Sequence, residues 1–379
     1  MSQKIPAYLK EAVKYVISAG ERKKIQNQIS IRKLQDRAIR DFDQHSKKLI
    51  VFLVPGTDRQ TGTDKISGGV ISIVSLCEES TSLKSIHGAE VIMCTLPNEL
   101  VLFRHTQFKN DTNVFRFSQL RQYFGSLSEV IIHIPEFTCG YFLEHLSEQD
   151  KDWLAAIPYL QINILNQNIR LMPGDEIIGK IKALADKVTC TTAHQRYCTE
   201  EYRRKFGVPL HKLSVWISPE KYHFVQFAEK ENLIIISPDP HPSRDEVIEK
   251  LRKIKGLTAQ VIQNLTYEEY KATIGRAKWA LTFGEGLDGY IIEPIFSGSV
   301  AFAVYNEDFF TPDFKELETI YDSYDQLLDN IESDIQKLDN ESSFQTYQQL
   351  EFARCSWHYS EQVYKNNLAA YYKNEYTFP

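Results

Sequence analysis

One short turn carries the residues best suited to chemistry. An apolar, strand-like run from residue 277 ends in the turn, and a helix-like run follows it. The turn consists of Gly284, Glu285, Gly286, Leu287, Asp288 and Gly289. Its three glycines let backbone N–H groups approach an anion closely, and the following helix directs its positive end at the same point. The sequence therefore predicts a phosphate site at this turn.

Two carboxylates belong to the same stretch. Glu285 lies in the turn, and Glu293 follows eight residues later in the predicted helix. An ionised carboxylate accepts two hydroxyl hydrogens at once, so each glutamate suits a vicinal diol on a ribose or a hexose. Phosphate and diol sites side by side are what a nucleotide or a nucleotide sugar requires.

The elements that position these residues alternate between strand and helix. In the first half we expect strands at 49–54, 90–95, 113–117, 129–134, 160–165, 187–191 and 213–217, and helices at 70–84, 141–155, 175–186 and 196–206. In the second half we expect strands at 232–236, 258–262, 278–283 and 300–304, and helices at 244–254, 266–276, 288–297, 324–334 and 344–375. This alternation is typical of α/β domains with parallel sheets, which bind ligands at the carboxyl ends of their strands.

The pattern divides the chain into four parts. We expect a basic helical extension at 1–48, a first α/β domain at 49–218, a second at 219–350, and a C-terminal helix at 351–379. Two α/β domains of similar size would face each other across a cleft.

The stretch from Glu285 to Gly298, followed by the strand at 300–304, resembles the E-x7-E element of the retaining glycosyltransferases of family 4. The segments 188–219, 258–281 and 319–328 resemble other parts of that family, so the resemblance covers roughly 49–330. It implies the GT-B fold, in which two Rossmann-like domains face a cleft. By this resemblance 49–218 is the acceptor domain, 219–350 is the donor domain, and the helix at 351–379 packs back on the first domain. It also implies that Glu293 binds the ribose of the donor and that Glu285 approaches the donor sugar.

The function that the resemblance implies is transfer of a hexose from a nucleoside-diphosphate sugar to a carbohydrate or glycolipid acceptor, in polysaccharide or surface-glycan synthesis. Retention of the anomeric configuration is part of that implication. No metal or other cofactor is expected, because the turn at 284–289, its helix end and Arg244 would stabilise the charge that develops on the leaving phosphate. In the family a leaving phosphate oxygen takes the acceptor proton, which would explain why no base is evident in the sequence.

Two departures from the family pattern motivate an alternative. Pro294 stands where the family has a small residue, and the Gly-Arg pair that holds the diphosphate is missing after the strand at 232–236. Arg244, at the head of the next helix, is the best substitute because a guanidinium grips phosphate oxygens in bidentate fashion. Lys250 is a weaker candidate. The alternative function is a catalytically inactive GT-B-shaped subunit that serves binding or assembly.

The first domain offers further candidates. Gly68 and Gly69 precede a predicted helix, where the family places a glycine pair near the donor phosphate. His133 and Glu136 end a strand where the family carries polar residues that touch a sugar, although a strand histidine is more often a core residue. The segment 166–168 closes another strand and suits sugar hydroxyls or a simple turn.

Other classes of function find little support. No apolar run is long enough to span a bilayer, and no secretory signal is visible, so we expect a cytoplasmic protein. The histidines and the scattered cysteines show no metal-ligand spacing, and we take the Asp41-Phe-Asp43 motif as chance. Residues 1–50 hold 12 Lys/Arg against 5 Asp/Glu, while the rest of the chain is acidic, which disfavours nucleic acid. The basic segment suits either a solvated helix on the body or a contact with anionic lipid at the inner membrane face or a protein partner.

Overall fold

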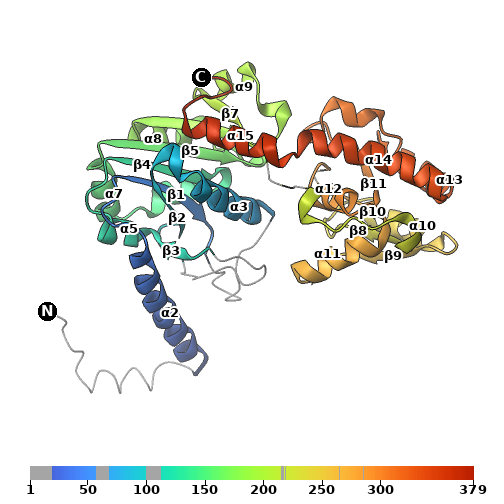
Figure 1. The fold of residues 1–379 in the computed structure, drawn as a ribbon, viewed down its shortest axis with the longest axis horizontal. Helices are drawn as coiled ribbons and strands as arrows, with labels where there is room; N and C mark the ends of the chain where they lie inside the picture. The colour runs from blue at the N-terminus through green and yellow to red at the C-terminus, as the bar shows by residue number, and fades with distance from the viewer. Residues whose placement is uncertain are drawn as a thin grey trace.

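The computed structural model describes residues 19–56, 68–99, 112–214, 217, 219–263, 265–284 and 286–379. They form two α/β units, each built on one parallel sheet, and a long C-terminal helical segment that reaches across both units (Figure 1).

The first unit contains a sheet of seven strands in the order β3-β2-β1-β4-β5-β6-β7, with every pairing parallel. Its strands are β1 (Lys48–Val54), β2 (Glu90–Thr95), β3 (Val114–Arg116), β4 (Glu129–Pro135), β5 (Tyr159–Asn166), β6 (Lys187–Thr192) and β7 (Leu210–Lys212). Its helices are α3 (Gly68–Ser82), α4 (Lys84–His87), α5 (Phe117–Tyr123), α6 (Cys139–His145), α7 (Glu148–Ala155), α8 (Asp175–Leu184) and α9 (Glu200–Phe206). The central strands are buried on both faces, as continuous runs of Val, Ile and Leu require.

The second unit contains a sheet of five strands in the order β12-β11-β10-β8-β9, again all parallel. Its strands are β8 (Glu231–Ile236), β9 (Thr258–Val261), β10 (Ala277–Leu281), β11 (Val300–Val304) and β12 (Ile320–Tyr321). Its helices are α10 (Arg244–Lys253), α11 (Tyr267–Arg276), α12 (Gly289–Phe296), α13 (Tyr324–Leu338) and α14 (Glu341–His358).

The strand order fixes where a ligand can enter. Each sheet is extended in one direction and then in the other, so the connections diverge between β1 and β4 in the first sheet and between β8 and β10 in the second. Crevices open at the carboxyl ends of the strands at such points. Glu136 directly follows β4, and Gly284 follows β10 by three residues.

The C-terminal segment returns the chain to the first unit. Helix α14 packs on the second sheet, and after a break at Tyr359 and Ser360 helix α15 (Glu361–Tyr372) packs on the first sheet (Figure 1). Beyond α15, Phe378 forms an antiparallel bridge with Leu210 on β7, the edge strand. We call the segment 359–378 the strap.

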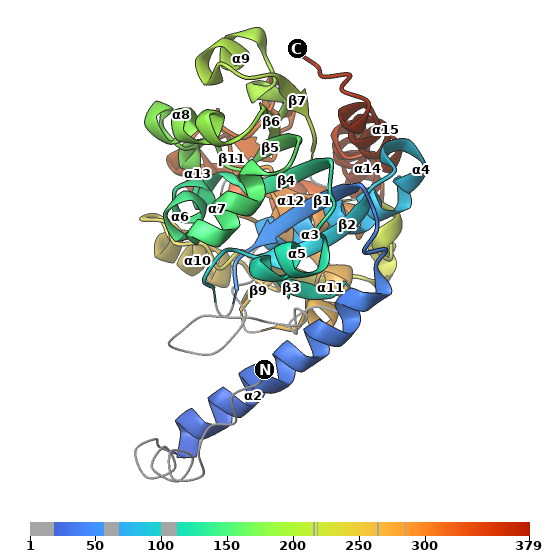
Figure 2. The ribbon, with the colours of Figure 1, turned by 90° about the vertical axis from the view of Figure 1, so that its left-hand side faces the viewer.

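Helix α2 (Ala19–Ala38) leaves the body of the protein as a long projection (Figure 2). Its last turns contact the first unit: Gln35 donates from Nε2 to the Val114 carbonyl at 2.6 Å, and Asp36 pairs with Arg116 at 2.6 Å. Among the described helices, none combines the length and apolar character that crossing a bilayer demands.

Candidate functional site

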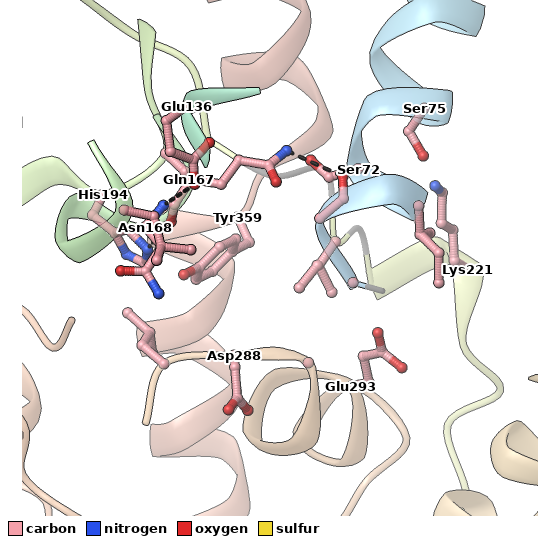
Figure 3. Close-up of a pocket in the computed structure, with 18 of the residues that line it drawn as sticks. Ser72, Ser75, Glu136, Gln167, Asn168, His194, Lys221, Asp288, Glu293 and Tyr359 are labelled. Carbon is pink, nitrogen blue, oxygen red and sulfur yellow. Dashed lines mark hydrogen bonds between the residues drawn. The ribbon is translucent and has the colours of Figure 1, made fainter. Parts of the chain in front are cut away.

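A cavity of about 440 Å³ lies between the two sheets, where both crevices open. This volume is in the range of small-molecule sites. The first unit contributes Gly68, Gly69, Ser72, Glu136, Asn168 and His194, and the second contributes Tyr267, Asp288, Gly289 and Glu293. Lys221 and Tyr222 come from the segment between β7 and β8, which joins the two units, and Tyr359 comes from the strap (Figure 3).

Glu293 reaches the cavity from the first turns of α12 (Figure 3). Its position explains Gly289: a Cβ atom there would lie 2.9 Å from the Glu293 Oε1 atom. Within the described part of the chain, the buried Oε2 atom of Glu293 accepts no hydrogen bond. The sequence-predicted diol-binding carboxylate therefore lies in the cavity with one acceptor atom left for a ligand.

The surroundings of Glu293 raise the pKa of its carboxyl to about 7, because burial disfavours the charged form. The hydroxyls of Tyr222 and Tyr270, and then the Lys221 ammonium, act in the opposite direction. The carboxyl is thus poised to change charge near neutral pH.

The turn before α12 needs glycine for steric reasons. Gly286 has φ +102°, and a Cβ atom there would lie 2.1 Å from the fully buried ring of Phe310. Glu285, the expected contact of the donor sugar, lies outside the described residues.

Carboxylates surround the place where the sequence predicts a phosphate. Asp288 caps α12 by accepting the Tyr290 N–H at 2.9 Å. A Cβ atom at Gly284 would lie 2.8 Å from an Asp288 oxygen and 2.9 Å from Oδ2 of Asp239, an atom that is buried and has no hydrogen-bond partner among the described residues. The turn and the start of α12 are therefore acidic, which disfavours a phosphate at Gly284.

Arg244, the expected diphosphate contact, begins α10 but does not line the cavity. Its guanidinium lies 3.9 Å from Asp245, and its Nε atom is buried. Lys221 is instead the one Lys or Arg among the described residues of the cavity wall. Burial lowers the pKa of Lys221, while Glu78 and Glu293 oppose that shift. Nothing in the local sequence indicates a role for Lys221, because the stretch between the two units shows no periodicity.

The first unit presents a helix terminus and a carboxylate. Gly68 and Gly69 begin α3 at the cavity, so the positive end of this helix lies beside the same space. Glu136 is buried, and its Oε1 atom accepts the Asn168 N–H at 3.0 Å. Both sequence-predicted features line the cavity.

His133 does not reach the cavity. Its fully buried ring stacks on Phe52 with centroids 4.4 Å apart, and Asn163 Nδ2 lies 3.1 Å from its Nδ1 atom. Burial lowers the pKa of His133 to about 3, so the ring is neutral. The contact with a sugar that we expected is corrected here: on a central strand buried on both faces, His133 is a core residue.

Sequence reasoning also missed His194, Tyr222, Tyr267 and Tyr359. His194 Nε2 lies 3.1 Å from the Gln167 carbonyl, and burial lowers its pKa to about 4. These residues come from four separate segments that only the tertiary structure brings together.

No family model matches the sequence, and no curated protein matches it. Solved structures do match. A sucrose-phosphate synthase from Thermosynechococcus elongatus gives a TM-score of 0.53 at 10% identity, over 86% of this chain and 99% of that one. An alpha-glucosyltransferase in complex with UDP and a 13-mer DNA containing an HMU base gives 0.54 at 9% identity, over 87% and 100%.

A third structure, Anabaena HepE in complex with UDP and glucose, gives a TM-score of 0.50 at 9% identity, over 86% of this chain and 99% of that one. At such identities the similarity concerns the fold. The two parallel sheets and these near-complete matches confirm the fold class predicted from the sequence: this chain has the GT-B fold of two Rossmann-like domains facing a cleft.

Proposed function

We propose that this protein is a glycosyltransferase that binds a nucleoside-diphosphate sugar in the interdomain cavity and transfers the sugar to a carbohydrate acceptor. The observation that carries the proposal is the Glu293 carboxylate, which lines the cavity with a buried oxygen that accepts no hydrogen bond within the described residues. A ribose diol would supply the missing donors. The GT-B neighbours add support, because two of them were solved with UDP.

The cavity suggests how the chain would handle the diphosphate. Because the turn at Gly284 is acidic, we assign the phosphates to the start of α3 and to Lys221, which together offer the positive end of a helix dipole and a positively charged side chain. As the C1–O bond to the diphosphate breaks, negative charge develops on a phosphate oxygen, and these groups would stabilise it.

The remaining steps follow the family 4 resemblance. A new bond forms between C1 and the acceptor hydroxyl, whose proton goes to the leaving phosphate oxygen, so no separate base is needed. The start of α3 and Lys221 would take the place of a metal at the diphosphate. Glu136 would bind a sugar hydroxyl, and Glu285 would approach the donor sugar. The proposal includes retention of the anomeric configuration, a hexose as the transferred sugar, and a role in polysaccharide or surface-glycan synthesis. It also includes a place in the cytoplasm, where residues 1–48 would contact an anionic membrane or a protein.

Thermal unfolding tests the donor site without knowledge of the acceptor. The wild type, Glu293→Ala and the control Glu246→Ala, which removes an exposed carboxylate on α10, would be measured with UDP, GDP, dTDP, ADP and CMP. A nucleotide at 100 times its Kd adds about 2.7 kcal/mol of stability, which raises Tm by several degrees. We expect one nucleotide to stabilise the wild type and the control but not Glu293→Ala. No shift with any nucleotide would overturn the proposal.

A second candidate function is a GT-B-shaped subunit that binds or assembles without transferring sugar. The acidic turn at Gly284 and the absence of Arg244 from the described cavity wall favour it. Release of UDP from UDP-glucose, followed over hours, separates the two functions: a transferase slowly passes the sugar to water, whereas an inactive subunit releases no UDP above the buffer rate.

A further inference from the structure

Tyr359 brings a third structural element into the cleft. It follows α14 at the start of the strap, and its ring, 8% exposed, belongs to the same core cluster as Cys355 and Phe310 of the second unit. The cavity wall nevertheless includes it. In Figure 3 its hydroxyl points toward Asn168 and away from Glu293.

The hydroxyl of Tyr359 makes no hydrogen bond to any described residue. The buried hydroxyl of Tyr197 also has no partner among the described residues, but Tyr197 does not line the cavity, whereas Tyr359 does. Several other buried tyrosines are paired. Tyr371 accepts from Gln161 at 2.9 Å, Tyr372 pairs with Ser80 at 2.6 Å, and Tyr347 donates to Thr319 at 3.2 Å. A buried tyrosine hydroxyl usually has a partner, and phenylalanine would fill the same space without leaving a polar group unpaired. The Tyr359 hydroxyl is therefore placed for a group that enters the cavity.

The position of the hydroxyl indicates which part of a ligand it meets. Glu293 and Lys221 lie at one end of the cavity, whereas Glu136, Asn168 and His194 lie at the other, and the Tyr359 hydroxyl points toward the second end (Figure 3). Burial raises the pKa of Tyr359, so the hydroxyl is neutral and can both donate and accept. Such a group matches a sugar hydroxyl, which also does both.

We propose that Tyr359 determines specificity for the transferred sugar by hydrogen bonding to one of its hydroxyl groups while Glu293 holds the nucleoside. This inference rests on the proposed function and deepens it. It also makes the strap part of the binding site, so that the segment joining the two units contacts the ligand directly.

The test compares two ligands that differ only in the sugar. Binding of UDP and of UDP-glucose would be measured by calorimetry, or of GDP and GDP-mannose if a guanosine nucleotide is the one that stabilises the protein. The variant is Tyr359→Phe, which keeps the ring, and the control is Tyr305→Phe, a tyrosine of the same unit that does not line the cavity. A net hydrogen bond of about 0.5–1.5 kcal/mol corresponds to a change of roughly two- to twelvefold.

We expect Tyr359→Phe to lower the affinity for the nucleotide sugar by about three- to tenfold. The affinity for the free nucleoside diphosphate and the Tm without ligand should stay unchanged. If the variant and the wild type bound the nucleotide sugar with equal affinity, the inference would be overturned, since the hydroxyl would then contact water alone. Equal weakening of both ligands would overturn it as well, because the residue would then shape the cleft as a whole. If the wild type itself bound neither ligand, the proposed function would fail, and this inference with it.

Discussion

At the scale of single residues, the charge of Glu293 decides whether the site can accept a diol. Its carboxyl has a pKa raised to about 7, and only the ionised form accepts two hydroxyl hydrogens without presenting a proton of its own. Lowering the pH through 7 therefore removes this acceptor.

We expect nucleotide affinity to fall about tenfold between pH 8 and pH 6, because a group of pKa 7 is about 90% ionised at the first pH and about 90% protonated at the second. Isothermal calorimetry at several pH values measures this directly. Glu293→Gln should bind more weakly at pH 8 and show a flat profile. A wild-type profile as flat as that of the glutamine variant would contradict the assignment.

The site residues that could be predicted are those whose role is indicated by the neighbouring sequence. Glu293 and Gly289 lie one helical turn apart and explain each other, and Glu136 ends a strand at the cleft. His133 lies only three residues before Glu136, but the strand is buried along its length. Nothing local indicates that Tyr359 reaches the cavity, because its place depends on how the whole C-terminal segment folds back.

At the scale of elements, the Gly284–Gly289 turn is held against the loop that follows β11. Phe310 from that loop packs where any side chain at position 286 would extend, and the backbone at Gly286 is left-handed. The turn at Gly286 therefore cannot shift toward the loop without displacing Phe310.

Gly286→Ala should destabilise the protein by about 1–3 kcal/mol, from strain at positive φ and from the clash with a ring that cannot move aside. Thermal unfolding measures the loss, and nucleotide binding should weaken with it. Gly174→Ala is the matched control, because its Cβ would meet nothing within 4 Å at φ −70°. A variant at 286 as stable as the one at 174 would refute this account of the turn.

Most elements were predictable from periodicity, and the failures have a physical reason. The strand expected at 300–304 has the same bounds as β11. The last strand of the first sheet, expected at 213–217, lies at 210–212 instead. A three-residue edge strand that pairs partly with Phe378 has no pattern of its own. The helix expected at 344–375 is broken at Tyr359 and Ser360, where the chain must pass from one unit to the other.

At the scale of the whole molecule, the strap docks on the first sheet through aromatic contacts with three buried or half-buried histidines. The ring centroids of His87 and Tyr372 lie 4.9 Å apart, and those of His133 and His211 lie 5.5 and 6.0 Å from the centroid of Tyr371. Burial lowers the pKa of each histidine. The docked strap therefore holds these rings in their neutral form.

Acid should loosen the strap. An unfolded histidine has a pKa near 6.5 and the folded rings have lower values, so the undocked state binds more protons as the pH falls below 6.5, and docking weakens. Hydrogen exchange corrected for its intrinsic rate should show α15 less protected at pH 5 than at pH 7, relative to α13. His211→Gln should reduce this difference, because glutamine can donate to the Asn367 carbonyl and accept from the Thr377 N–H as the neutral ring does. Equal protection of α15 at both pH values would count against the idea.

The strap also determines the order in which the two domains are completed during synthesis of the chain. Residues 361–378 leave the ribosome only after the whole second domain, yet they cover one face of the first sheet and pair with its edge strand. Until they arrive, α3 covers that face without Tyr364, Leu368 and Tyr371 of the strap, and β7 lacks its bridge to Phe378. The first domain is therefore completed only after the second has been synthesised, so docking of the strap is the last step in its folding.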